Sequence, residues 1–388
     1  MKAAPSLNPI RVIRFMESHQ SEPKASDQPA GNGMQRLTRR QTRLNAPTIF
    51  VLCLFLGVLA ARKLISPPAV PYTTSQSVFT ADKTCMGAPW SIKVAATNGM
   101  TSDEIARSIE AAFAEVDRVE SIMSEWRPDS PISAINASAG KDPIEVPDEL
   151  RKIILRANEL SRLSNGAFDI TWKGMGNLWR WSDEDFSAPS EEEINQARQR
   201  VDYRKIEITE NRVGLKDPGM EIGLGGIAKG YGVDRAALIL RDAGLRNFMI
   251  DGGGDILTAG VKFGSPWRLG IQHPREGRDV LMAALDVTDA ALVTSGDYER
   301  ARVIDGRRVH HILDPRTGMP ASKCRSVSVV APDAETADAL ATTIFVLGPK
   351  EGLRLISDRP RTEALIIDAD GRLWKTDGFG TTVGAPLP

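Results

Sequence analysis

The stretch EIGLGGIAKGYGVDRAALIL, residues 221–240, joins a short apolar segment to a helical pattern through a glycine-rich turn. Such turns let the backbone approach an anion, and the dipole of the following helix favours negative charge. Gly223, Gly225 and Ala228 fit the loose G-x-G-x-x-A dinucleotide fingerprint, which is a weak signal by itself. Glycine follows Lys229 where a Walker A loop requires Ser or Thr, so that loop is excluded. The stretch therefore predicts a phosphate-binding turn with Lys229 in the first turn of the helix.

The chain around this turn alternates strands and helices, which predicts an α/β fold. Thr101 and Glu104 have capping-box spacing at the start of a helix over residues 101–126. A second helix begins near Pro147 and ends before Gly166. Further strands are expected at residues 91–96, 205–209, 247–253, 267–272, 283–288 and 326–331, further helices at 229–243, 334–346 and 350–357, and a closing hairpin at 363–376.

Composition excludes several functional classes. Lys and Arg number 49 and Asp and Glu 50 among 388 residues, so the net charge is near zero, and no basic stripe with interleaved aromatic residues indicates nucleic-acid binding. Cys85 and Cys324 lie far apart, and no Cys/His cluster is present, which argues against zinc or iron–sulfur chemistry. The sequence leaves open whether these two cysteines pair in an oxidising compartment.

The N-terminal region predicts export. Arg39, Arg40 and Arg43 precede an apolar run at residues 46–61, which is short for a membrane span. The paired arginines match twin-arginine export, but Thr42 and Arg43 stand where that signal prefers apolar residues. An uncleaved anchor in the inner membrane is the alternative, and Met34 is a candidate start. We therefore expect a periplasmic or membrane-anchored protein.

This gives three parts of the chain. Residues 1–61 are an N-terminal extension with the export signal, residues 62–77 are a Pro- and Ser-rich linker, and residues 78–388 are the functional domain.

The segment APDAETADALATTIFVLG, residues 331–348, is helical in pattern. Asp338 and Thr342 stand four positions apart and share one helix face, where a carboxylate and a hydroxyl suit a hard cation such as magnesium. The structural alternative is that the helix dipole favours Asp338 and that Thr342 bonds back to a carbonyl one turn earlier.

Eight segments, in order along the chain, resemble the FAD:protein FMN transferase family, also called ApbE. The tryptophan-rich WRWSDED at residues 179–185 and the arginine-rich signal resemble its NosX branch, which is associated with nitrous-oxide respiration. The eight segments are MGAPW (86–90), MSEWRPDSPISAIN (123–136), NGAFDITWKGMGNLW (165–179), GLGGIAKGYGVDRA (223–236), DGGGDI (251–256), TSGDYER (294–300), HHILDPRTGMPA (310–321) and APDAETADALATTIFVLG (331–348).

The resemblance implies a fold and an activity. The fold is α/β, with mixed sheets and helices in two interlocked subdomains and the FAD cleft between them. The activity is magnesium-dependent transfer of FMN from FAD to a threonine or serine hydroxyl of a partner flavoprotein, within a Ser/Thr-Gly-Ala-Thr-like sequence, releasing AMP.

The resemblance also implies site residues. The metal ligands are Asp338, Thr342 and a backbone carbonyl of the glycine turn, at Gly226. His311 is the base for the acceptor hydroxyl, with a histidine-like pKa of about 6.5; the alternative is a core histidine in a strand, with His310 facing solvent. The expected FAD contacts are Met86, Trp126, Ala167, Phe168, Asp169, Lys229 and Ile312.

Two residues depart from the family pattern. Trp126 stands where the family commonly has tyrosine, which keeps a stacking surface but loses the phenol hydroxyl. Gly223 stands where an acid often precedes the glycine turn, which removes one contact to FAD.

Three other functions compete with transfer. One is FAD binding or storage without transfer, which an intact Asp338, Thr342 and His311 disfavour. The second is an FAD pyrophosphatase, in which the same metal activates water. The third is a Rossmann dehydrogenase. It is disfavoured because the G-x-G-x-x-A fingerprint lies within the set of eight ApbE-like segments, which accounts for many more residues.

Overall fold

The computed structural model describes residues 76–96, 99–176, 178–179, 188–277, 279–304 and 307–380. These residues lie in the compact unit that contains Thr73–Pro388. The predicted export signal and nearly all of the predicted linker lie outside the described residues. In the described part of the chain, no helix is both long enough and apolar enough to cross a membrane.

The helices follow the predicted pattern closely. Thr101 and Glu104 form the expected capping box, in which each backbone N–H donates to the side chain of the other residue. Pro147 is the N-cap of the second predicted helix. The helices of the described chain are α2 (Ser102–Met123), α3 (Pro131–Ala137), α4 (Asp148–Leu163), the 3-10 helix η1 (Ile170–Met175), α5 (Glu191–Arg198), the 3-10 helix η2 (Tyr203–Lys205), α6 (Ala228–Asp242), α7 (Ala334–Leu347) and α8 (Pro349–Ile356).

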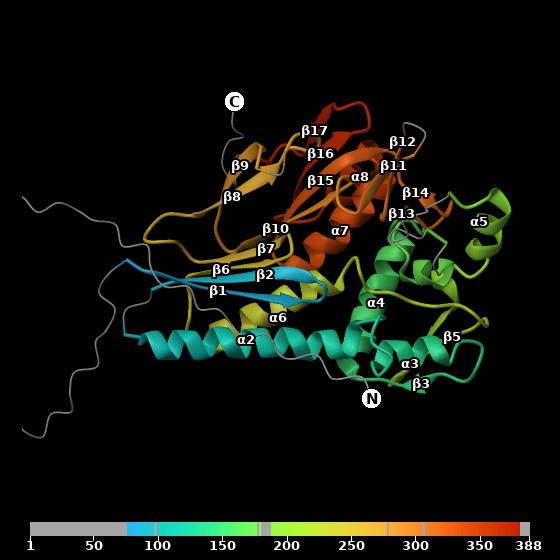
Figure 1. Ribbon diagram of the computed structural model, residues 1–388, viewed down its shortest axis with the longest axis horizontal. Coiled ribbons are helices and arrows are strands. Elements are labelled where there is room, and N and C mark those ends of the chain that lie inside the picture. Colours follow the sequence, from blue (N-terminus) through green and yellow to red (C-terminus); the bar gives the residue numbers. More distant parts are fainter. Residues whose placement is uncertain are drawn as a thin grey trace, which may run out of the picture. The chain divides into compact units, whose positions relative to one another are not determined.

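An eight-stranded sheet, ordered β1-β2-β6-β7-β10-β15-β16-β17, forms the centre of the fold (Figure 1). All of its strand pairs are antiparallel. The α/β class is thus confirmed, but the strands are not mixed in direction, because several neighbours are joined directly by tight turns. Its strands are β1 (Val78–Cys85), β2 (Ala88–Ala95), β6 (Phe248–Gly252), β7 (Asp255–Ala259), β10 (Ala290–Gly296), β15 (Cys324–Ala331), β16 (Glu363–Asp368) and β17 (Leu373–Lys375).

Four small sheets surround the large one. Three of them are the two-stranded sheets β8–β9, β11–β12 and β13–β14, and the fourth is the three-stranded sheet β3-β5-β4. His311 lies between β12 and β13. The strands of these sheets are β3 (Ile144–Glu145), β4 (Ile206–Ile208), β5 (Arg212–Leu215), β8 (Trp267–Gln272), β9 (Leu281–Val287), β11 (Ala301–Ile304), β12 (Arg307–His310), β13 (Leu313–Asp314) and β14 (Met319–Pro320).

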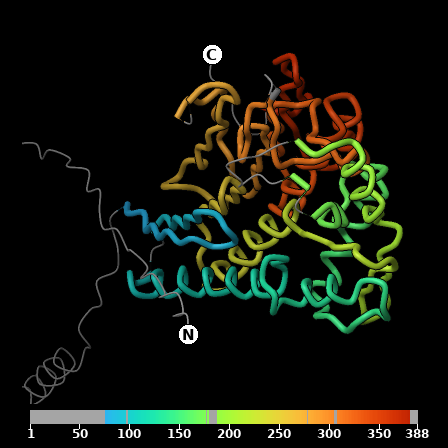
Figure 2. Tube along the Cα trace, turned by 45° about the vertical axis from the view of Figure 1, so that its right-hand side comes forward, coloured from blue at the N-terminus to red at the C-terminus, as the bar shows by residue number. Residues whose placement is uncertain are grey.

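The two faces of the large sheet have separate cores. Because strand side chains alternate, Phe248 and Ile250 of β6 join the core on the helical side, whereas Met249 joins Trp267 and Leu285 of the β8–β9 hairpin on the other side. Helices α2, α6 and α7 cover the first face, where α2 packs against β1 and α6 (Figure 2). Cys85 and Cys324 are buried as free thiols, so they do not pair.

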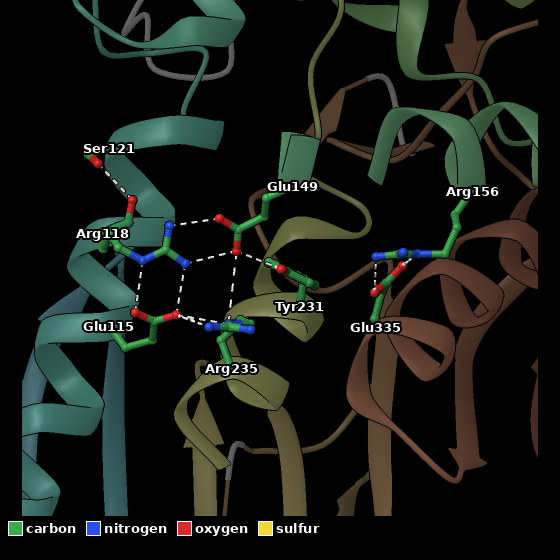
Figure 3. Close-up of polar contacts among 8 residues, drawn as sticks. All are labelled: Glu115, Arg118, Ser121, Glu149, Arg156, Tyr231, Arg235 and Glu335. Atoms are coloured by element: carbon green, nitrogen blue, oxygen red, sulfur yellow. Dashed lines mark hydrogen bonds and ion pairs between the residues drawn. The ribbon is translucent and has the colours of Figure 1, made fainter. Parts of the chain in front are cut away.

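A network of ion pairs and hydrogen bonds joins α4 to α2, α6 and α7 (Figure 3). Arg118 of α2 donates to Glu149 of α4 at 2.7 Å, and the Tyr231 hydroxyl of α6 donates to the same carboxylate at 2.6 Å. Farther along α4, Arg156 donates to Glu335 of α7 at 2.7 Å. The network ties α6 and α7, which carry the predicted site residues, to the same neighbouring helix.

Candidate active site

Helices α6 and α7 meet at a close backbone contact. A side chain at Gly230 would overlap the carbonyl of Ala334, so glycine is required there. Asp234 of α6 caps α7, because the backbone N–H groups of Ala334 and Glu335 donate to its carboxylate at 2.9 Å each. The first turn of α6 is therefore fixed beside the N-terminal half of α7.

Asp338 and Asp255 form a buried acid pair at this contact, with exposed fractions of 4% and 2%. The backbone N–H of Gly230 donates to Asp338 Oδ2 at 3.2 Å. Lys229 Nζ lies 2.7 Å from Asp255 Oδ1. Asp255 Oδ2 has no hydrogen-bond partner among the described residues. Two carboxylates thus share one ammonium, and a buried oxygen is left to accept a donor or a cation.

Burial and the neighbouring charges shift the pKa values of Asp338 and Lys229. Burial raises the pKa of Asp338 well above its ordinary value, and the negative charge of Asp255 raises it further. Burial disfavours the charged form of Lys229 and lowers its pKa, but the negative charges of Asp255 and Asp338 outweigh this effect and raise the pKa above the ordinary value. A divalent cation bound here would relieve the repulsion between the carboxylates.

The three predicted metal ligands come together at this point. Thr342 lies one turn after Asp338 on α7, and a Cβ built on Gly226 would lie 3.4 Å from Thr342 Oγ1. The hydroxyl of Ser295 on β10 also lies 3.4 Å from Thr342 Oγ1. These oxygens are hydroxyl, carboxylate and backbone groups, the donors that magnesium prefers.

The described residues contain no group of three or more His, Cys, Asp and Glu side chains placed to hold a metal. The carboxylate, hydroxyl and backbone oxygens named above fit magnesium, which is held by one or two carboxylates together with water and substrate phosphates. The residues present therefore fit the cation that the sequence resemblance implies.

The two adjacent histidines have different surroundings. His310, with an exposed fraction of 2%, donates from Nε2 to the carbonyl of Ala321 at 2.8 Å. Its Nδ1 accepts the N–H of Ile312 at 3.2 Å, and its ring meets Phe345 edge to face. Both ring nitrogens are occupied, so His310 is a core residue. The alternative interpretation of the sequence, in which His310 faces solvent, is wrong.

His311 follows the last residue of β12 and is half-buried. Its Nδ1 lies 3.1 Å from the carbonyl oxygen of Glu299, so Nδ1 carries the hydrogen and Nε2 keeps a lone pair. Burial lowers the pKa of His311 to about 4, and the positive charges of Arg300 and Lys229 contribute. The expected value near 6.5 was wrong, because the sequence does not show this burial.

Of the predicted residues 167–169, Phe168 contacts the glycine turn. A Cβ on Gly226 would lie 3.2 Å from Phe168 Cε2, and Ala167 is buried beside Phe168 in the core. Asp169 caps η1: it accepts the N–H of Thr171 at 2.8 Å and its hydroxyl at 2.6 Å, and the N–H of Tyr203 at 3.0 Å. Burial raises the pKa of Asp169, and these hydrogen bonds oppose the rise.

The remaining predicted contacts differ in exposure. Trp126, just after α2, has an exposed fraction of 70%, and Lys173 Nζ lies 4.6 Å from its ring centroid. Met86 occupies the β1–β2 turn, and its sulfur would lie 3.1 Å from a Cβ on Gly232 of α6. Ile312 is buried, with its carbonyl accepting the N–H of Ala321 at 2.9 Å.

Sequence reasoning missed two polar residues of this site. Asp255 lies in DGGGDI and Ser295 in TSGDYER, segments that mark glycine turns and that we did not assign to the site. Asp255 pairs with Val293 across β7 and β10, which brings it near Ser295. Their signal was an acid or hydroxyl next to a glycine at a strand end, which by itself more often marks a turn.

The ApbE family model matches residues 86–366 of the chain. The chain belongs to the ApbE family. A similar curated protein, the FAD:protein FMN transferase of Treponema pallidum, is 33% identical over 293 residues, covering 71% of this chain and 81% of the relative. The Vibrio cholerae FAD:protein FMN transferase is 31% identical over 302 residues, covering 76% and 87%.

Solved ApbE structures have the same fold. The Thermotoga maritima ApbE protein aligns with a TM-score of 0.71 at 33% identity, covering 79% of this chain and 99% of that one. The Vibrio cholerae flavin transferase ApbE aligns with a TM-score of 0.70 at 29% identity, covering 79% and 99%. The ApbE resemblance and the α/β architecture are thus confirmed, while the division into two subdomains remains a prediction.

Proposed function

We propose that this ApbE protein transfers FMN from FAD to a threonine or serine hydroxyl of a partner flavoprotein and releases AMP. The observation that carries the proposal is the neutral imidazole of His311, whose Nδ1–H is fixed on the Glu299 carbonyl. The charge of Lys229 acts on this ring, and Lys229 contacts the acid pair. These two observations support a single site that combines a base with a cation-binding group.

His311 Nε2 takes the proton of the acceptor hydroxyl in this scheme. The hydroxyl oxygen forms a bond to the FMN-side phosphorus, and the bond from that phosphorus to the bridging oxygen breaks. AMP leaves with the bridging oxygen, and the proton passes from the imidazolium to AMP or to water. The products are AMP and an acceptor whose threonine or serine is joined to FMN through a phosphoester bond.

The chain's other residues position the dinucleotide. Gly226, Asp338 and Thr342 would hold magnesium, which would withdraw negative charge from the pyrophosphate oxygens during bond breaking. Lys229 supplies a fixed positive charge at the start of α6, where the helix dipole also favours phosphate. The exposed ring of Trp126 offers a stacking surface for one of the two ring systems of FAD.

The test incubates the full chain with FAD, MgCl₂ and an acceptor domain that carries the Ser/Thr-Gly-Ala-Thr-like sequence. Mass spectrometry should find one FMN added to the acceptor, with AMP formed in equal amount. An acceptor whose target threonine is changed to valine should remain unmodified. FMN and AMP in solution with an unmodified acceptor would indicate a pyrophosphatase, and bound FAD without turnover would indicate a binding protein; either result overturns the proposal.

We further propose that the functional domain acts in the periplasm, after export by the arginine-rich signal or while anchored by it. The NosX-like features favour a flavoprotein of nitrous-oxide respiration as the acceptor. A reporter fused after Pro67 should be active only outside the cytoplasm. Cytoplasmic reporter activity would contradict the assignment.

A further inference from the structure

Glu125 reaches the glycine turn from a distant part of the sequence. It lies two residues beyond the end of α2, next to Trp126. Its Oε1 lies 2.9 Å from the position that a Cβ on Gly223 would occupy, and 4.0 Å from the corresponding position on Gly225. The carboxylate therefore fills the space beside Gly223 into which a side chain at position 223 would project.

Gly223 itself is held firmly in place. Its N–H donates to the carbonyl of Ile170 at 2.8 Å, and its own carbonyl accepts Trp172 Nε1–H at 3.1 Å. The Trp172 ring and the Lys173 Cβ would lie 3.1 and 3.2 Å from a Cβ on this glycine. The backbone cannot easily move away from Glu125, so the contact is a fixed feature of the turn.

The carboxylate of Glu125 is partly buried and accepts hydrogen bonds only from the backbone among the described residues. Burial raises the pKa of Glu125, while the N–H groups of Glu125 and Leu224 and the charge of Lys173 oppose the rise. Lys173 Nζ pairs instead with Glu221 at 3.5 Å and lies over the ring of Trp126. Within the described residues, Glu125 itself forms no salt bridge.

Glu125 connects two parts of the proposed FAD site. It precedes the exposed Trp126 in the chain, and its carboxylate lies beside the turn that leads to Gly226 and Lys229. A partly buried carboxylate at such a place accepts hydrogen bonds strongly. The N–H and O–H groups of a flavin dinucleotide are suitable donors.

We propose that Glu125 is an FAD-binding residue, whose carboxylate stands in for the acid absent from position 223 and accepts a hydrogen bond from an N–H or O–H group of the dinucleotide. This inference rests on the proposed function, because it takes FAD as the ligand of the site. It adds a residue that the family motifs did not assign.

The experiment measures FAD binding by the full chain, with magnesium and without acceptor, by calorimetry or flavin fluorescence. Glu125→Ala should weaken FAD binding by about 10- to 100-fold, the loss expected for a charge-assisted hydrogen bond. Glu125→Gln should weaken it less, because the amide keeps the packing and an acceptor oxygen. Glu221→Gln is the matched control, because it removes a nearby negative charge, the partner of Lys173, and it should bind FAD like the parent.

A reciprocal exchange tests the position itself. Gly223→Asp alone should bind FAD poorly, because its Cβ would lie 2.9 Å from Glu125 Oε1. Combining Gly223→Asp with Glu125→Ala should bind FAD more tightly than Gly223→Asp alone, because the contact with Glu125 is removed and only the contacts of 3.1 and 3.2 Å with Trp172 and Lys173 remain. Circular dichroism and melting curves establish that each variant is folded.

The outcomes separate this inference from the proposed function. If the parent chain does not bind FAD, the proposed function fails with it. If the parent binds FAD and folded Glu125→Ala binds equally well, only the Glu125 assignment is wrong. A double variant that binds no better than Gly223→Asp alone also contradicts it. Binding of FMN and of AMP to Glu125→Ala shows which half supplies the donor, since only that half should lose affinity.

Discussion

His311 donates its Nδ1–H to the carbonyl of Glu299 at 3.1 Å, which leaves Nε2 as the acceptor nitrogen of a neutral imidazole. This tautomer is the one that a general base requires. We expect His311→Ala to lower the rate of FMN transfer by about 10²- to 10⁴-fold, the usual contribution of a general base, while FAD binding stays near the parental value.

The neighbouring histidine supplies the control. Because the two ring nitrogens of His310 are occupied in the core, His310→Ala should lower the free energy of unfolding by about 2–4 kcal/mol, from the cavity and the unpaired polar groups. Folded His310→Ala protein should still transfer FMN. Parental transfer by His311→Ala, or loss of FAD binding in step with its activity, would make His311 a structural residue.

The pH dependence of transfer should reflect the buried position of His311. Burial lowers the pKa of His311 to about 4, so the ring stays neutral and able to accept a proton well below the ordinary histidine range. We expect kcat/KM to hold steady from neutral pH down to about pH 5 and to fall near pH 4. The profile is measured at FAD and magnesium concentrations that saturate the parent. A midpoint near 6.5 in folded protein would show that the base is less buried or is another group.

Cation binding should release a proton from the acid pair. Burial and the charge of Asp255 raise the pKa of Asp338, and magnesium binds the ionised form, so affinity should increase with pH. Calorimetry in buffers of different ionisation enthalpy measures the proton count. Excess chelator should stop FMN transfer by the parent, and full activity in its presence would exclude the magnesium assignment.

Asp338→Asn separates catalysis from stability. A carboxyl whose pKa is raised by folding destabilises the folded state as pH rises above its unfolded value, and asparagine removes that effect. Without magnesium at pH 8, the variant should therefore melt at or above the parental temperature. It should lack FMN transfer and gain no thermal stability from magnesium. A variant that magnesium stabilises as much as the parent would remove Asp338 from the site.

The contact between α6 and α7 should not tolerate a side chain. Gly230→Ala would place a Cβ against the Ala334 carbonyl, and we expect a loss of about 1–3 kcal/mol in unfolding free energy, the range for overpacking. Gly277→Ala is the control, since a Cβ there meets nothing within 4 Å. Denaturant melts measure both variants. Equal stability would mean that the two helices separate at little cost.

The exposed ring of Trp126 should contribute to binding and not to folding. We expect Trp126→Ala to weaken FAD affinity by about 1–3 kcal/mol, the scale of aromatic stacking on a ring system, with an unchanged melting temperature. Leu373→Ala is a matched control on an exposed apolar side chain, with an exposed fraction of 56%. An unchanged FAD affinity in Trp126→Ala would show that neither ring of FAD stacks there.

Local features of the sequence predicted the main helices and strands of the fold. The capping box of Thr101 and Glu104, the apolar periodicity of α2 and the glycine turn before α6 each depend on residues within a few positions. Such short-range signals fix where helices and strands begin and end. The spacing of Asp338 and Thr342 also placed both side chains on one face of α7 before any contact was known.

Tertiary structure decided which of these side chains act together. Asp338 and the N–H of Gly230 stand 108 positions apart and meet only because α6 packs on α7. The family resemblance selected His311, but hydrogen-bond partners on other strands and turns place His310 in the core and fix the tautomer of His311, and the low pKa of His311 comes from burial. The contact of Glu125 with Gly223 has the same origin. Desolvation and long-range contacts are properties of the packed chain, so no local pattern of residues encodes them.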